Sequence, residues 1–291
     1  MNWFTDPLSF EFMRHAVLVA VLMGILCPVV GSYLIVQRMG LLGDVIAHAV
    51  LPGLAIAFYL GIDIFLGAFI SGTLSTLIIA WIQSQSRVKI DVAMALVFSG
   101  FLALGIMLIT VLESKLDLHS FLFGDILSVT SRDVVRTLMI TLFILLCVRL
   151  FYKELLFYTF NPLGAQAMGL PVNLINIGLV SAITLTIIAS MQAVGVVLVV
   201  SLLIGPAITA YLLVKELHQM MGLGAIFGIF SSVAGMYISY YLNVPSGAAI
   251  VLTVSGLFIL ALLFSPSQGI LTRPEANSPR SVLQKFKQWK Q

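Results

Sequence analysis

Two long stretches without a charged side chain constrain this fold more than any other feature of the sequence. No Asp, Glu, Lys or Arg occurs between Glu154 and Lys215, or between Glu216 and Arg273. Only 9% of the 291 residues are charged, whereas soluble domains carry about 25%, because a water-facing surface needs charge. Apolar runs of this length are typical of helices that cross a lipid bilayer. The sequence therefore predicts a polytopic membrane protein and excludes a soluble enzyme.

Charges, prolines and polar clusters divide the chain into about eight or nine apolar segments. Each segment approaches the roughly 20 residues that a helix needs to cross a bilayer, and none shows the short alternating pattern of barrel strands. We therefore predict an all-α fold with one transmembrane domain over residues 1–265. The expected spans are 15–37, 41–60, 64–82, 92–112, 134–151, 172–190, 193–214, 222–242 and 246–264.

Basic residues near the segment ends predict the orientation, because cytoplasmic loops are enriched in Lys and Arg. This rule gives nine spans with the N-terminus outside. Arg132 and Arg136 conflict with it, since they would then lie outside. A short helix within 113–131 that does not cross is the alternative, and it leaves the count open by one. The parts placed in the cytoplasm are 83–90, 155–171, 215–221 and the tail 266–291.

The tail 266–291 carries five basic residues and a single acidic one, Glu275. A short helix on the anionic inner leaflet and an irregular tail both agree with this composition. Nucleic acid is not an expected partner, because no basic stripe lies on a folded domain.

Asp44 and His48 are the strongest candidates for chemistry, because an ionisable side chain inside a bilayer is costly and usually functional. They lie four positions apart in the second span, so a helix brings them to one face about 6 Å apart. Pro52 has no N–H and leaves the carbonyl of His48 without its helical partner. Carboxylate, carbonyl and imidazole together suit a divalent transition metal. A pair that only fixes helix packing is the alternative.

Three further residues are weaker candidates for the metal path. Asp91 opens the fourth span and is either a third ligand or, more simply, the cap of its helix. Asp117 and His119 lie in an acidic segment on the expected outer side, where they either attract cations or belong to a solvated loop.

The loop 155–171 is expected in the cytoplasm but carries no charge. Asn161 suits a helix N-cap, Pro162 the first helical position and Gly169 the C-terminal stop, which predicts a two-turn helix over about 162–168. An uncharged helix outside the membrane indicates a contact with another protein. A helix lying on the lipid surface is the alternative.

Five blocks in order resemble the metal-type permeases of ABC importers, which carry manganese, zinc or iron. They begin with Gly43-Asp-Val-Ile-Ala-His-Ala-Val-Leu-Pro-Gly53, and the similarity covers most of the chain apart from its two ends. The other four blocks are Asp117-Leu-His-Ser-Phe-Leu-Phe-Gly-Asp-Ile-Leu127, Asn161-Pro-Leu-Gly-Ala-Gln-Ala-Met-Gly-Leu170, Val194-Gly-Val-Val-Leu-Val-Val-Ser-Leu-Leu-Ile-Gly-Pro-Ala207 and Ser239-Tyr-Tyr-Leu-Asn-Val-Pro-Ser-Gly-Ala248.

The resemblance implies a homodimeric permease in a bacterial inner (plasma) membrane, two separate cytoplasmic ATPase subunits and an extracytoplasmic metal-binding protein. It assigns Asp44 and His48 to the metal path, and the segment of about 161–170 to a coupling helix that contacts the ATPase. Members of the family often carry an acid where this chain has Asn161. The coupling residues that it implies are Asn161, Pro162, Leu163, Gly164, Ala165, Met168 and Gly169.

We therefore expect a transport subunit that is not itself an enzyme and holds no permanent cofactor. The chain has no GxxxxGK[ST] phosphate loop, so ATP hydrolysis belongs to a partner. A carrier driven by an ion gradient is the main alternative, but it needs more buried carboxylates than Asp44. Mn²⁺ is the favoured cargo because oxygen ligands are at least as numerous as nitrogen ligands, with Zn²⁺ and Fe²⁺ as rivals.

Overall fold

The computed structural model describes residues 9–112, 124 and 126–265. These residues form helices, and no strand occurs among them, as the sequence predicts. The helices are α1 (Glu11–Val36), α2 (Leu42–Ala49), α3 (Leu51–Leu60), α4 (Ile64–Gln85), α5 (Ile90–Val111), the 3-10 turn η2 (Ile126–Ser128), α7 (Ser131–Leu150), α8 (Tyr152–Phe160), α9 (Pro162–Ala167), α10 (Val172–Val194), α11 (Val196–Tyr211), α12 (Leu217–Leu242) and α13 (Ser246–Phe264).

Each expected span coincides with a helix or a broken helix. The segment 41–60 is divided into α2 and α3 at Val50, just before Pro52. Among the described residues, seven spans are long and apolar enough to cross a membrane, and α7 with α8 forms an eighth candidate that is bent by 71°. The ninth, α11, has 16 residues and reaches only about 24 Å at 1.5 Å per residue. The prediction of about eight or nine membrane-spanning helices is confirmed.

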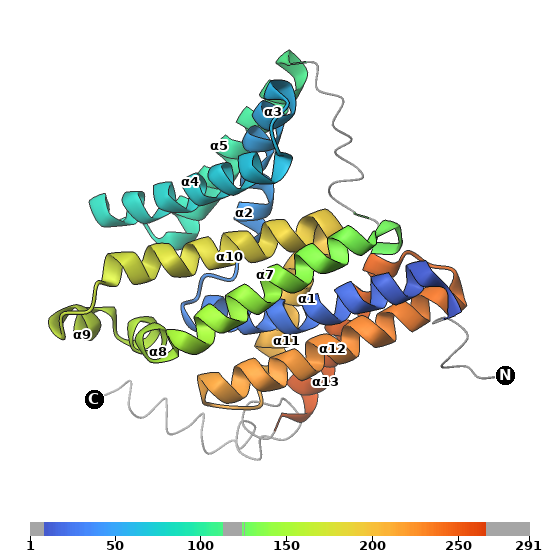
Figure 1. Ribbon diagram of the computed structural model, residues 1–291. Helices are drawn as coiled ribbons and strands as arrows, with labels where there is room; N and C mark the ends of the chain where they lie inside the picture. Colours follow the sequence, from blue (N-terminus) through green and yellow to red (C-terminus); the bar gives the residue numbers. More distant parts are fainter. Residues whose placement is uncertain (1–8, 113–123, 125, 266–291) are drawn as a thin grey trace, which may run out of the picture.

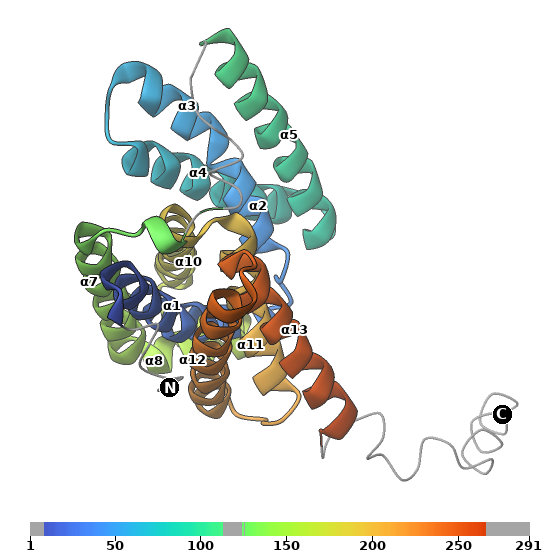
Figure 2. The ribbon, with the colours of Figure 1, turned by 90° about the vertical axis from the view of Figure 1, so that its right-hand side faces the viewer.

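The helices form two groups that α2 connects. The first contains α3, α4 and α5, and the second contains α1, α7, α10, α11, α12 and α13 (Figures 1 and 2). Within the second group, α1 contacts α7, α10, α11 and α12. From its place between the groups, α2 contacts α4 and α5 on one side and α10 and α11 on the other.

Small residues allow α1 and α12 to approach closely. A Cβ on Gly24 of α1 would lie 2.7 Å from the carbonyl oxygen of Gly228, and a Cβ on Gly228 would collide with the carbonyl of Gly24. Gly224 packs against Pro28 of α1. Any side chain at the Gly24–Gly228 crossing would therefore force the two helices apart.

Different helix ends lie at the two ends of the second group. α1 and α7 begin at one end, whereas α8 and α9 lie at the opposite end (Figure 1). At the first end, Arg136 of α7 lies over the ring of Phe65 of α4, 4.0 Å from its centroid. A cation–π contact thus engages one of the two arginines that conflict with the predicted orientation. The sidedness of the membrane stays a prediction.

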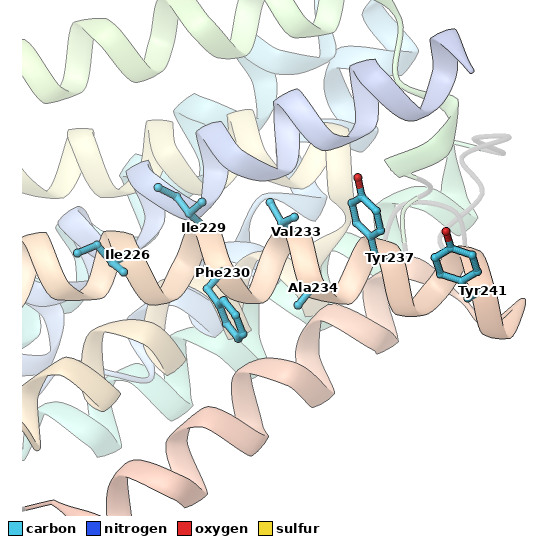
Figure 3. A pocket seen from close by; sticks show the side chains of 7 residues that line it. All are labelled: Ile226, Ile229, Phe230, Val233, Ala234, Tyr237 and Tyr241. Atoms are coloured by element: carbon cyan, nitrogen blue, oxygen red, sulfur yellow. The ribbon is translucent and has the colours of Figure 1, made fainter. Parts of the chain in front are cut away.

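One face of α12 carries mainly apolar side chains that the rest of the described chain leaves partly or largely exposed (Figure 3). Such a face is typical of a helix that contacts lipid or another membrane helix. The residues that line its hollow are Ile226, Ile229, Phe230, Val233, Ala234, Tyr237 and Tyr241.

Candidate functional site

The helix that carries Asp44 and His48 is held against neighbours by glycine contacts. A Cβ on Gly43 would lie 2.9 Å from the Leu203 side chain of α11, so this glycine lets α2 approach α11. On the other side, Gly105 of α5 lies against Leu51 and Pro52, where α3 begins. The predicted metal pair therefore lies on a helix that contacts both helix groups.

His48 and Asp44 contact each other, as their spacing predicts. The Nδ1 atom of His48 lies 3.0 Å from the backbone oxygen of Asp44 and 3.5 Å from its carboxylate Oδ1. A carbonyl oxygen only accepts, so Nδ1 carries the proton and donates it. The lone pair of a neutral His48 is then on Nε2, which is the ring nitrogen that can bind a metal ion. A carboxylate or carbonyl on the other ring nitrogen is the usual support of a ligating histidine.

The pair is partly exposed, which a transient cation site requires. The Asp44 side chain is 48% exposed and the His48 side chain 20%. The ring of Phe98 from α5 meets the His48 ring edge-on, with centroids 5.0 Å apart. Phe98 thus restricts the orientation of the imidazole, and no sequence pattern predicts this contact.

The break after α2 agrees with the chemistry expected of Pro52. α2 ends at Ala49, and Pro52 lies in the first turn of α3. Because proline has no N–H, the carbonyl of His48 lacks its usual donor four residues along the helix. This carbonyl is an oxygen on the same helix as the Asp44–His48 pair.

The structure does not bring Asp91 to the pair. Asp91 is exposed in the first turn of α5, about 10 Å along the helix axis from the level of Phe98 at 1.5 Å per residue. No cluster of three or more His, Cys, Asp or Glu side chains that could hold a metal occurs in the described part of the chain. The expectation that Asp91 caps its helix is also wrong, because Lys89 holds that position. Asp117 and His119 lie outside the described residues.

The helix α9 has the termini that its sequence predicts. The Asn161 side chain accepts a hydrogen bond from the N–H of Gly164 at 2.9 Å, and Pro162 occupies the first turn. Gly169 has φ of 80°, which few other residues adopt at low cost, so the helix stops there. Ala165 is buried, whereas Leu163 and Met168 are 80% and 74% exposed. The described chain thus leaves two large apolar side chains of α9 uncovered.

One feature beside α9 escapes sequence reasoning. Arg38, in the turn between α1 and α2, has φ of 59°, and Gln37 donates to the Thr159 hydroxyl of α8 at 3.4 Å. The local sequence does not predict a left-handed backbone at Arg38. Glycine is the residue expected to adopt that conformation, and the glycine of this turn, Gly40, lies two positions later.

Residues 9–265 match the ABC 3 transport family. The chain belongs to this family. It is 46% identical over 272 residues to a manganese transport system membrane protein, MntC, of Halalkalibacterium halodurans, covering 93% of each chain. It is 42% identical to a manganese import system permease protein, ScaB, of Streptococcus gordonii, over 91% of this chain and 95% of the relative.

A solved structure is also similar to this chain in both sequence and fold. The structure described as PsaBC from Streptococcus pneumoniae in complex with Fab contains a chain 42% identical to it, with a TM-score of 0.82. The match covers 92% of this chain and 96% of that chain. The fold expected from the resemblance is therefore confirmed.

Proposed function

We propose that this chain is the membrane-spanning permease subunit of an ABC importer that moves Mn²⁺ across a bacterial plasma membrane into the cytoplasm. The observation that carries the proposal is the Asp44–His48 contact on α2, in a chain of the ABC 3 transport family. Relatives with more than 40% identity are named for manganese transport. A mixed oxygen and nitrogen donor set accepts Mn²⁺, and also Zn²⁺ and Fe²⁺.

The two side chains have different roles toward the transported ion. Asp44 supplies negative charge that lowers the cost of a divalent cation within the helix bundle. His48 offers Nε2 while its Nδ1–H is held by the Asp44 carbonyl. With only these side chains and the carbonyl of His48, which lacks the N–H that Pro52 cannot donate, the site binds weakly enough to release its ion, as a transport path requires.

The helix α9 is the contact with the ATPase in this proposal. Its exposed Leu163 and Met168 lie on a short capped helix without charge. Apolar side chains that are exposed outside the membrane favour burial in a partner. Movement of the ATPase on hydrolysis would reach the bundle through α8, which is bent by 71° from α7.

The complete transporter in this proposal contains two copies of the permease, two cytoplasmic ATPase subunits and an extracytoplasmic metal-binding protein. The open apolar face of α12 agrees with a bundle that is surrounded by lipid or by a second membrane subunit. The metal is cargo, and we propose no permanent cofactor and no catalytic residue in this chain.

Uptake of radiolabelled Mn²⁺ and Zn²⁺ by cells that depend on this transporter tests the proposal. The wild-type chain should import Mn²⁺ in preference to Zn²⁺, and both Asp44→Ala and His48→Ala should abolish most of the uptake at unchanged protein levels. Normal Mn²⁺ uptake by either variant would remove the proposed metal site. Preferential Zn²⁺ uptake would keep the site but change its cargo.

A further inference from the structure

The turn between α1 and α2 exposes one charged side chain next to α9. Arg38 lies two residues beyond the end of α1 and is exposed. No ion pair involving Arg38 occurs among the described residues. Its φ of 59° is in the left-handed region, which costs a residue other than glycine on the order of 1 kcal/mol or more. Residues held in such conformations often belong to functional surfaces.

Arg38 lines a hollow of about 310 Å³ that is otherwise uncharged. The polar residues Gln37 and Thr159 also line the hollow, and the hydrogen bond between them joins the α1–α2 turn to α8. The hollow extends to Pro162, where α9 begins, so the arginine and the proposed coupling helix share one surface. The remaining lining residues are Val36, Met39 and Tyr158.

We propose that this hollow receives a carboxylate side chain of the ATPase subunit that docks on α9. The planar guanidinium of arginine matches a carboxylate with two parallel hydrogen bonds. Arg38 is the one charged side chain among the described residues of the hollow and α9. The apolar side chains of α9 give the contact its area, and Arg38 gives it charge specificity. The inference rests on the proposed role of α9.

This contact also connects the ATPase to the metal pair. Arg38 and Asp44 lie six positions apart, separated by the turn and the first residues of α2. A partner that holds Arg38 therefore holds the segment that leads into α2. The Gln37–Thr159 hydrogen bond makes the same segment follow α8.

Association of the purified permease with its ATPase subunit, measured in lipid nanodiscs at low and high salt, tests the proposal. Arg38→Gln should weaken association by about tenfold or more, because it leaves the partner's carboxylate unpaired in the contact. Arg38→Gly relieves the backbone strain at this position but removes the charge, and it should weaken association as much as Arg38→Gln. Arg38→Lys should retain most of the affinity. The matched control is Arg87→Gln, which removes an exposed arginine outside the hollow.

Results with three of these or related variants would overturn the inference. If Arg38→Gly binds the ATPase subunit as tightly as the wild type, the charge at this position has no role and only the backbone conformation matters. An equal loss of association in Arg87→Gln would indicate that the ATPase responds to the overall positive charge of the surface and not to Arg38. An equal loss in Glu275→Gln would indicate that the carboxylate belongs to the chain's own tail.

A further variant separates this inference from the proposed function. Leu163→Asp should abolish association through α9 whether or not Arg38 takes part. If Leu163→Asp weakens association and Arg38→Gln does not, the role of α9 stands and the carboxylate contact fails. If Leu163→Asp has no effect, the role of α9 itself fails.

Discussion

At the scale of single residues, the position of one proton defines the proposed site. The Nδ1–H of His48 is engaged by the Asp44 carbonyl at 3.0 Å, which directs the free lone pair to Nε2. Asp44 then acts through its carboxylate charge and by holding the imidazole. The two residues therefore have different roles, which their four-residue spacing alone does not predict.

Removing the charge of Asp44 without changing its size should strongly impair transport. We expect Asp44→Asn to lower Mn²⁺ uptake at limiting metal by about ten- to a hundredfold, the usual cost of losing a carboxylate beside a metal-binding histidine. Asp91→Asn is the matched control, since Asp91 is exposed on α5 and apart from the pair. Uptake rates at several Mn²⁺ concentrations check both variants. An equal loss in Asp91→Asn would place Asp91 in the path.

The residue-scale prediction from sequence has a clear physical limit. Helix periodicity alone brings Asp44 and His48 to one face, so their contact was predictable. The Phe98 contact and the left-handed Arg38 depend on tertiary packing and on turn geometry. No local pattern encodes either of them.

At the scale of helices, close packing of α1 on α12 should dominate stability. Gly228→Ala would place a methyl group against the backbone of Gly24, so the helices must separate. We expect a loss on the order of 1–3 kcal/mol, as in other overpacked contacts. Gly222→Ala on the same helix is the control, because nothing lies within 4 Å of a Cβ there. Thermal unfolding in detergent compares the two, and equal unfolding temperatures would contradict the packing account.

The cap of α9 offers a second test at this scale. Asn161→Ala removes the acceptor for the N–H of Gly164 and should destabilise the helix by about 1 kcal/mol. Asn161→Asp keeps an acceptor and should behave like the wild type. Limited proteolysis around residues 155–171 reports the difference. Equal cleavage of the wild type and Asn161→Ala would show that the cap does not hold α9.

Helix positions were largely predictable, because charge-free apolar segments have few other stable forms in a bilayer. The ends of α9 follow from Asn161, Pro162 and Gly169, whose preferences are local. The bend between α7 and α8 was not predicted, since no proline or glycine marks it in the sequence. The grouping of the helices around α2 depends on contacts between segments far apart in the chain.

At the scale of the whole molecule, the site and the proposed ATPase contact lie at the two ends of one short path. The α1–α2 turn touches α8 and α9 at one end and leads into Asp44 at the other. Because α2 joins the two helix groups, a shift of one group against the other changes the surroundings of the pair. This arrangement suits a site that ATP hydrolysis opens to alternate sides.

The energy source tests the central claim most directly. Radiolabelled Mn²⁺ uptake should be measured in proteoliposomes that contain the permease with its ATPase, with ATP or with a proton gradient as the only energy supply. We predict uptake with ATP alone, and its loss in Asp44→Ala and His48→Ala. Uptake driven by the gradient without ATP, or ATP-driven uptake that both variants retain at the wild-type rate, would contradict the account.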